Sequence, residues 1–255
     1  MHNRGANCFP SGEMKKWMDI MGQKRRLQMG ETAVVAGGTG LVGRELLNLL
    51  LAGERYANVI AIGRRPTGLS DPRLEERAME GGQPEQCLEG IPGGYDLFIA
   101  TGTTIKKAGT REAFRRVDYE LPLRLAEMAA SQGAGALVIV SSIGASPDSR
   151  YFYLRVKGEL ERQLEKLSLR RLIVLRPSQL LGKRQERRPG EKWAAALAKP
   201  LSGLMVGKLA RYRPVHAATV ASAMLEAAKR APEGVTVVES EQIAAIGSHG
   251  WGADE

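Results

Sequence analysis

The stretch Val34-Val35-Ala36-Gly37-Gly38-Thr39-Gly40-Leu41-Val42-Gly43 joins a short apolar run to glycines at three-residue spacing. An amphipathic segment, residues 44–51, follows it. This order predicts a strand, a tight turn and the start of a helix. Glycines let the backbone turn sharply and approach a ligand, and the free N–H groups of a helix start attract anions. The stretch therefore predicts a diphosphate site; an ordinary strand-to-helix turn is the alternative interpretation.

The length and composition are those of an ordinary globular protein. The chain has 255 residues, 43% of them hydrophobic and 25% charged, which fits one large α/β domain or one domain with a small appendage. Cys8 and Cys87 are the only cysteines, and with three histidines they make no metal-ligand spacing. We therefore expect no metal site and a reducing, cytoplasmic setting. No run of about 20 apolar residues predicts a membrane span.

The net charge of +9 is concentrated at the start of the chain. Residues 1–30 hold six basic and two acidic residues, so they contribute +4 of it. Aromatic residues make up only 5%, and no basic stripe is interleaved with them, so nucleic-acid binding is a minor hypothesis and an anionic ligand is favoured. Residues 1–29 are interpreted as a flexible N-terminal extension; a basic tail that docks on a partner is the alternative.

Apolar runs alternate with amphipathic segments along the rest of the chain. Strands are expected at 32–36, 58–62, 95–100, 135–141, 171–175 and 235–239, with helices at 40–51, 114–130, 151–167 and 217–228. A third strand is expected near 76–79, where no good apolar run exists, and Pro122 predicts a kink or a helix start near Leu121. The pattern predicts an α/β doubly wound, Rossmann-type parallel sheet with helices on both faces. A single dinucleotide-binding domain is expected over 30–242, with a C-terminal tail over 243–255.

The residues after the second and fourth strands indicate which dinucleotide binds. Gly63-Arg64-Arg65 stands where an NAD site usually has an acidic residue for the ribose 2′-hydroxyl. Guanidinium groups cannot accept that hydrogen bond, but they can donate paired hydrogen bonds to a 2′-phosphate. NADP(H) is therefore favoured over NAD(H). Solvated loop charges are the alternative. Thr101-Gly102-Thr103 is expected to pack beside the ribose groups, although a simple loop would look the same.

Tyr153 and Lys157 lie four residues apart on one face of an expected helix, after a strand that ends in Ser141-Ser142. An ammonium beside a phenol stabilises the phenolate, which makes tyrosine a better proton donor and acceptor near neutral pH. The lysine can also bond the nicotinamide ribose, and a serine hydroxyl can hold the substrate oxygen. The alternative is that Tyr153 packs in the core and Lys157 is solvated.

Together these motifs resemble the short-chain dehydrogenase/reductases over roughly residues 31–240. Within that superfamily the chain is most similar to the atypical branch that includes the Tat-interacting protein and its bacterial relatives. The strings that carry this resemblance are Gly102-Thr103-Thr104, Lys107-Ala108-Gly109, Arg116-Val117-Asp118, Leu175-Arg176-Pro177, Leu180-Leu181, Arg184-Gln185-Glu186-Arg187-Arg188-Pro189-Gly190-Glu191 and Pro214-Val215-His216.

The resemblance implies a bound NADPH and assigns residues to it. Tyr153 would be the proton donor, and Ser142 is chosen over Ser141 because it lies further past the strand end. The expected catalytic set is Ser142, Tyr153 and Lys157. The expected cofactor set is Gly37, Thr39, Gly40, Leu41, Val42, Gly43, Arg64, Arg65, Thr101, Gly102, Tyr153, Lys157, Leu180 and Arg188.

Two departures from the family pattern leave the substrate open. The acidic end of the third strand, which contacts adenine in the family, is not recognisable near Arg77-Ala78-Met79-Glu80. The segment after the sixth strand is short, so a small C-terminal substrate lobe is expected.

Two functions compete at this point. The first is an NADPH-dependent reductase of a small carbonyl compound, favoured by the presence of Tyr153, Lys157 and Ser142 together. The second is an NADPH-binding sensor or adaptor that regulates a partner with little turnover, favoured by the small lobe and the basic tail. A nucleic-acid or electron-transport assembly partner is a weaker third hypothesis. By analogy with the family, a homodimer through the helices at 121–130 and around Tyr153 is expected.

Overall fold

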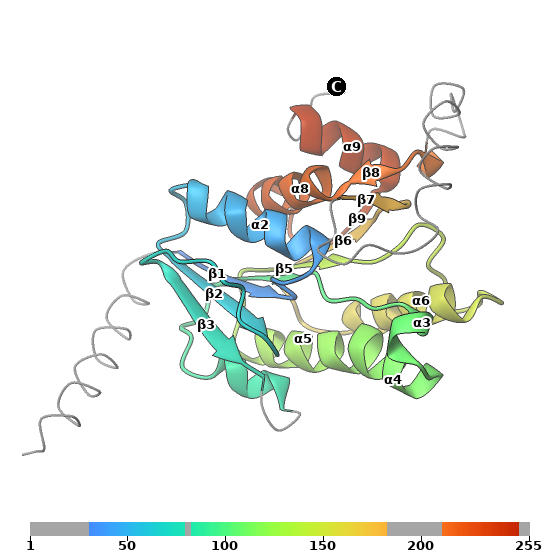
Figure 1. Cartoon of the computed structure of the whole chain (residues 1–255), viewed down its shortest axis with the longest axis horizontal. Helices are drawn as coiled ribbons and strands as arrows, with labels where there is room; N and C mark the ends of the chain where they lie inside the picture. The colour runs from blue at the N-terminus through green and yellow to red at the C-terminus, as the bar shows by residue number, and fades with distance from the viewer. Residues whose placement is uncertain (1–30, 80–82, 183–210, 250–255) are drawn as a thin grey trace, which may run out of the picture.

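A seven-stranded parallel sheet forms the centre of the molecule (Figure 1). The computed structural model describes residues 31–79, 83–182 and 211–249. The strand order is β3-β2-β1-β4-β5-β6-β9, so the direction of winding reverses between β1 and β4. The strands are β1 (Thr32–Ala36), β2 (Asn58–Gly63), β3 (Leu74–Ala78), β4 (Asp96–Ile99), β5 (Ala136–Val140), β6 (Arg171–Arg176) and β9 (Gly234–Glu239). The predicted doubly wound α/β fold is confirmed.

Helices cover both faces of this sheet. On one face lie α2 (Leu41–Ala52), α8 (Ala217–Arg230) and α9 (Ser240–His249); on the other lie α5 (Leu121–Ser131), α6 (Phe152–Leu164) and the 3₁₀ turn η1 (Pro84–Leu88) (Figure 1). Successive residues of each strand point to opposite faces of the sheet, so a hydrophobic core forms on each face. Val35 packs on the α2 side and Val34 on the α5 side, both with no exposed surface. No helix within the described ranges is long and apolar enough to cross a membrane.

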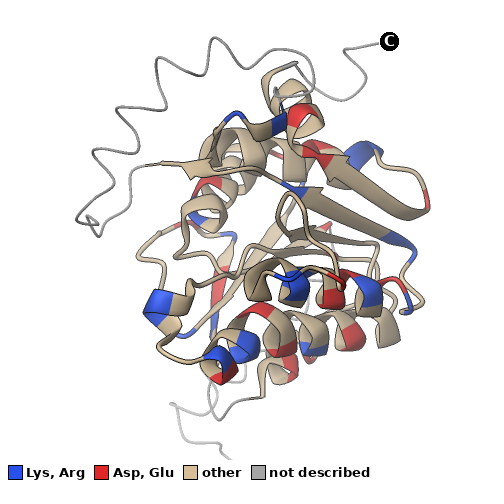
Figure 2. Cartoon of the chain, turned by 90° about the vertical axis from the view of Figure 1, so that its right-hand side faces the viewer, with Lys and Arg blue, Asp and Glu red and all other residues tan. Residues whose placement is uncertain are grey.

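Short helices follow β4 at the edge where the strands end. They are α3 (Ile105–Ala108), α4 (Arg111–Arg115) and a π-helical turn, η2 (Arg116–Glu120), which leads directly into α5. Viewed from this side, segments with Lys or Arg alternate with segments that carry Asp or Glu (Figure 2). The expected helix start near Leu121 is found, because α5 begins at Leu121 with Pro122 in its first turn, directly after the π-helical turn.

The third strand lacks an apolar run because of its place in the sheet. β3 pairs with β2 alone at the edge of the sheet, and each of its residues is half-buried or exposed rather than buried. Glu76 accepts hydrogen bonds from the backbone N–H and the hydroxyl of Thr67 in the loop that follows β2. A strand at the edge of a sheet tolerates such charges, which is why apolar patterning could only indicate its neighbourhood.

The ordered fold extends past the expected boundary at residue 242. Residues 243–249, predicted as part of a tail, belong to α9, whose Ile243 is fully buried. Gly247 lies so close to α8 that a Cβ there would stand 2.3 Å from the carbonyl oxygen of Thr219. The two helices therefore pack through small residues, which produce a weak amphipathic signal in the sequence. The predicted extension over residues 1–29 lies outside the described part of the chain.

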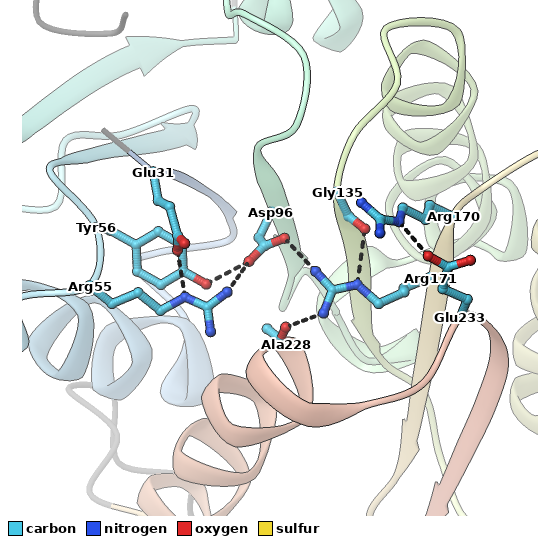
Figure 3. A network of polar contacts seen from close by, with 9 residues as sticks. All are labelled: Glu31, Arg55, Tyr56, Asp96, Gly135, Arg170, Arg171, Ala228 and Glu233. Atoms are coloured by element: carbon cyan, nitrogen blue, oxygen red, sulfur yellow. Dashed lines mark hydrogen bonds and ion pairs between the residues drawn. The ribbon is translucent and has the colours of Figure 1, made fainter. Parts of the chain in front are cut away.

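A buried polar network ties together the amino ends of the strands (Figure 3). The Asp96 carboxylate accepts a hydrogen bond from the Tyr56 hydroxyl at 2.7 Å and lies 3.4 Å and 3.5 Å from the guanidinium groups of Arg55 and Arg171. Arg171 also donates to the carbonyl of Ala228 at 2.7 Å. This network lies at the opposite edge of the sheet from the glycine turn, so it supports the fold rather than the site.

Candidate cofactor site and active site

The glycine turn is folded tightly against the end of β4. Gly37 has a φ of +94°, and a Cβ there would lie 2.8 Å from the carbonyl of Ala100. A Cβ on Gly43 would lie 2.2 Å from the carbonyl oxygen of Gly37, and Gly40 donates its N–H to that same oxygen at 2.9 Å. No larger residue fits at Gly37 or Gly43 without moving the backbone. The turn thus sits at the switch point between β1 and β4, where ligands bind in doubly wound sheets.

The amino end of α2 is open to an anion. Its N-cap, Gly40, offers no side-chain hydrogen bond, and the first turn contains no acidic residue. The backbone N–H groups of the first turn therefore keep their partial positive charge. Arg44, also in this turn, donates to the carbonyl of Thr67 and so joins α2 to the loop after β2. The arrangement is compatible with a diphosphate along residues 39–42, and that role stays a prediction.

Arg64 and Arg65 lie at the same edge, directly after β2. The N–H of Gly37 donates to the carbonyl of Ile62 at 3.3 Å, which fixes the glycine turn beside the end of this strand. Both arginines are exposed, and neither side chain has an ion pair or hydrogen bond to a residue in the described part of the chain. Two such guanidinium groups suit a phosphate, so their predicted role toward NADP(H) stays a prediction with a compatible geometry.

The turn after β4 holds a buried hydroxyl without a partner. The Oγ1 of Thr101 is buried and has no hydrogen-bond partner among the residues that the structure describes. Buried polar groups are nearly always paired, so an unpaired hydroxyl at this edge of the sheet is a candidate contact for a ligand. Gly102 beside it is exposed, and a Cβ there would lie 3.6 Å from Oδ1 of Asp118. These residues fit the predicted ribose-binding turn.

The segment that contains Leu180 adjoins the start of α2. Leu180 and Leu181 form β7, a two-residue strand paired with β8 (Val215–His216). A Cβ on Gly182 would lie 2.7 Å from a methyl group of Leu41, so the chain passes directly beside the glycine turn. This contact agrees with the predicted place of Leu180 in the cofactor cleft. Arg188 and most of the expected substrate lobe, residues 183–210, lie outside the described residues.

A cavity of about 280 Å³ opens at the end of β3, the region in which the sequence shows no recognisable acidic residue of the family pattern. Arg77 lines it, but its guanidinium is committed to Glu75 at 2.6 Å and to the carbonyls of Cys87 and Glu89, both at 2.9 Å. The thiol of Cys87 contacts the carbonyl of Ala78. Among the residues that the structure describes, no carboxylate lines this cavity.

Tyr153 and Lys157 lie on successive turns of α6, as expected, but in different surroundings. The half-buried Tyr153 ring meets the edge of the buried Phe114 ring at 5.8 Å between centroids. Lys157 is only 4% exposed, and its Nζ lies 2.9 Å from Oδ1 of Asp118. Burial by itself would lower the pKa of Lys157, but Asp118, followed by Tyr153 and Glu161, raises it to a net value above the ordinary one. Lys157 is therefore a buried ammonium with a counter-ion.

Asp118 is the site residue that the sequence interpretation missed. It lies in the π-helical turn η2, is 1% exposed, and accepts the backbone N–H of Thr103 at 2.8 Å through its second oxygen. Its only signal was membership of the family-like string Arg116-Val117-Asp118. Opposite charges on two separate elements, as at Asp118 and Lys157, cannot be paired from spacing along either element alone.

The two serines after β5 are used differently. The hydroxyl of Ser141 donates to Glu161, which in turn pairs with Arg176 at 2.6 Å. Ser142 is half-buried, and its hydroxyl makes only a 3.4 Å contact to the carbonyl of Ile143. The Ser141 hydroxyl is thus engaged by a buried carboxylate and that of Ser142 is not, and the choice of Ser142 as the catalytic serine stays a prediction.

Comparison with known proteins identifies the family. The family model described as HIM1 matches residues 96–210. Protein HTATIP2 from Rattus norvegicus is 36% identical over 198 residues, which cover 76% of this chain and 80% of the rat protein. This chain belongs to the HIM1/HTATIP2/FMP52 family. The family also includes the protein named FMP52, mitochondrial, from Debaryomyces hansenii, which is 36% identical over 156 residues, covering 61% of this chain and 69% of that protein.

Solved structures confirm the fold of this HIM1/HTATIP2/FMP52 member. A short-chain dehydrogenase/reductase superfamily protein from Agrobacterium tumefaciens, solved with bound NAD, superposes with a TM-score of 0.60 at 18% identity. The match covers 86% of this chain and 81% of that one. The rat relative thus confirms the expected branch at the level of family, and the solved structure confirms the fold.

Proposed function

We propose that this HIM1/HTATIP2/FMP52 member is an NADPH-dependent oxidoreductase that reduces a small carbonyl compound. One continuous set of contacts carries the proposal. Gly37 packs on Ala100, the turn after Ala100 presents the N–H of Thr103 to Asp118, and Asp118 pairs with Lys157. The contacts link the expected diphosphate turn to the expected catalytic helix.

The residues present fit a dinucleotide with a 2′-phosphate. The open amino end of α2 would hold the diphosphate, Arg64 and Arg65 would hold the 2′-phosphate, and the unpaired Thr101 hydroxyl would bond a ribose oxygen. When bound, NADPH supplies a hydride to the carbonyl carbon of the substrate. The remaining members of the expected cofactor set are Gly37, Thr39, Gly40, Leu41, Val42, Gly43, Gly102, Leu180 and Arg188.

The protein's own residues would handle the substrate oxygen. The Ser142 hydroxyl donates a hydrogen bond to the carbonyl oxygen and polarises it. Tyr153 then gives its phenolic proton to that oxygen as the carbon is reduced, so the product is an alcohol and the tyrosine becomes a phenolate. The ammonium of Lys157, one helical turn away, stabilises this phenolate until a proton returns from solvent.

Cofactor binding is tested by thermal shift with NADPH, NADP, NADH and NAD. We expect NADPH and NADP to raise the melting temperature most. Equal stabilisation by NADH would overturn the role given to Arg64 and Arg65.

Turnover is tested by following NADPH consumption with a panel of small aldehydes and ketones. Tyr153→Phe should abolish consumption, whereas Tyr151→Phe, which alters a 61% exposed neighbour, should not change it. Equal rates for wild type and Tyr153→Phe would remove Tyr153 from the mechanism.

One observation favours the alternative of an NADPH-binding sensor that controls a partner. The charge of Lys157 is already neutralised by Asp118 at 2.9 Å, which weakens its support for a phenolate. A sensor of this kind would bind NADPH as tightly after Tyr153→Phe as before. It would also consume no NADPH with any carbonyl in the panel.

A further inference from the structure

We propose that Thr67 and Glu76 set the preference for NADPH over NADH by holding the two arginines after β2 in place. The inference rests on the proposed binding of NADPH at this site. It adds two positioning residues, which act through the backbone of Arg64 and Arg65.

The segment that carries the two arginines is short and tied at both ends. At one end, Gly63 closes β2, and its carbonyl accepts the N–H of Met79 at 3.0 Å, directly after β3. At the other end lies Thr67, so that only residues 64–66 separate the two fixed points. Fixing Thr67 therefore restricts the backbone from which both guanidinium groups project.

Three elements meet at Thr67. Arg44, in the first turn of α2, donates to its carbonyl. Its methyl group lies 3.3 Å from the place that a Cβ on Gly38 would take, so it packs against the glycine turn. Glu76 on β3 accepts its backbone N–H at 2.6 Å and also its hydroxyl hydrogen bond. Thr67 thus links α2, the glycine turn and the edge strand of the sheet.

The Thr67 hydroxyl is used twice, because it also accepts the N–H of Leu69 at 3.2 Å. Gly68 between them has a φ of +69°, a conformation that favours glycine, and it turns the chain back toward the protein. Leu69 then packs against the core on the α2 side. The hydroxyl therefore closes a local turn and ties that turn to Glu76 on a separate element.

The charge of Glu76 and its hydrogen bonds have opposite expected effects on NADPH. Glu76 is exposed, and a carboxylate beside the arginine loop repels a 2′-phosphate by its charge alone. As an acceptor, however, it orders the loop before the cofactor arrives, which lowers the entropy cost of binding. Removing the acceptor and removing only the charge can therefore be told apart.

The test measures the dissociation constants of NADPH and NADH by isothermal titration for wild type, Glu76→Ala and Glu76→Gln. Alanine removes the acceptor, so we expect NADPH to bind about 3–10-fold more weakly and NADH nearly as before. Glutamine keeps an acceptor oxygen without the charge, so its NADPH constant should stay within about twofold of wild type. An NADPH affinity for Glu76→Ala equal to or higher than that for Glu76→Gln overturns the inference.

A double-mutant comparison shows whether Glu76 acts through the arginines. When Arg64→Ala and Arg65→Ala are already present, adding Glu76→Ala should leave the NADPH constant unchanged, because the groups that it positions are gone. A further loss of the same size would place the effect elsewhere and overturn the inference. Glu54→Gln removes an equal charge from an exposed residue beyond the far end of α2, and it should bind both cofactors like wild type.

Thr67→Val tests the same contact from its other side. Valine keeps the branched shape against Gly38 and removes only the hydroxyl, so we expect about threefold weaker NADPH binding and unchanged NADH binding. An unchanged NADPH constant would overturn the part given to this hydroxyl. Because the variant carries no change of charge, it also serves if Glu76→Ala does not fold.

The results for wild type separate this inference from the proposed function. If wild type prefers NADPH and Glu76→Ala keeps that preference in full, the positioning role alone is overturned. If wild type binds NADPH and NADH equally well, the role of Arg64 and Arg65 in the proposed function falls, and the inference falls with it.

Discussion

Glu161 on α6 pairs with Arg176 at the end of β6, with Oε2 2.6 Å from the guanidinium. The same carboxylate accepts the Ser141 hydroxyl, and the half-buried Arg176 reaches Glu239 at 3.0 Å, so one polar cluster ties the ends of β5, β6 and β9 to α6. The hydrogen bond to Glu161 outweighs the effect of burial and, together with Glu239, moves the pKa of Arg176 above its ordinary value. The cluster fixes the backbone from which Ser142 projects.

Glu161→Ala should therefore destabilise the fold. The change leaves Arg176 with one acidic partner and Ser141 without an acceptor, so we expect a loss of about 2–4 kcal/mol in the free energy of unfolding, measured by urea denaturation. Glu233→Gln, in an exposed pair with Arg170, should cost less than about 1 kcal/mol. Similar losses for the two variants would show that the Glu161 cluster contributes no more stability than an exposed ion pair.

The two serines should separate stability from activity. Ser141→Ala removes a buried hydrogen bond and is expected to cost about 1 kcal/mol of stability with little effect on NADPH affinity. Ser142→Ala should leave the melting temperature unchanged and lower kcat/KM for carbonyl reduction by about 10–100-fold, because a donor to the developing oxyanion is lost. The reverse assignment of effects would identify Ser141 as the substrate-binding serine.

Replacing both Arg64 and Arg65 with Ala should weaken NADPH binding by about 10–100-fold and leave NADH binding nearly unchanged, because only NADPH carries the 2′-phosphate. Isothermal titration with each cofactor measures the two constants. Arg230→Ala provides the control, since Arg230 is exposed on α8 and pairs with Glu226 at 3.3 Å. If NADPH and NADH affinities fall together, the arginines contribute only a general positive field.

Tyr56→Phe should destabilise the protein in a pH-dependent way. Burial raises the pKa of Asp96 above its ordinary value of 3.8, while the Tyr56 hydroxyl, Arg55 and Arg171 act in the opposite sense. A raised pKa in the folded state means that this group favours folding below 3.8, and the benefit is lost as the pH rises through the folded-state pKa. Loss of the hydroxyl raises the folded-state pKa further.

The expected cost of Tyr56→Phe is therefore about 1–2 kcal/mol near neutral pH and smaller near pH 4, where Asp96 gains a proton. Urea denaturation at both pH values measures the difference. NADPH affinity should not change, because Tyr56 lies at the opposite edge of the sheet from the glycine turn. A cost that is the same at both pH values would show that the charge of Asp96 is not what the Tyr56 hydroxyl stabilises.

Local patterns in the sequence were sufficient to predict most strands of the sheet and the glycine turn. The strand at residues 32–36 and the helix after it are where apolar runs and glycine spacing placed them. The same signal failed where an element is half-exposed, as in β3, or packs through small side chains, as in α9. In both cases the burial of the side chains is set by contacts with elements elsewhere in the chain, so the local sequence pattern alone does not show it.

The candidate site was predictable only in part, and for a related reason. Tyr153 and Lys157 could be paired because one helix sets their spacing. The acidic partner of Lys157 is Asp118 and the acceptor of the Ser141 hydroxyl is Glu161. Both pairings depend on how η2, α6 and the end of β5 come together. Ion pairs between separate elements have no characteristic spacing in the sequence, so a structure is needed to assign them.

The contact between Gly37 and Ala100 has a consequence for the kinetics of association. Because the two turns at the switch point touch backbone to backbone, they form one preorganised surface and cannot rearrange independently. A dinucleotide that docks there loses little binding free energy to ordering these segments. Its association rate should then be set by diffusion and charge steering rather than by a conformational step in these turns.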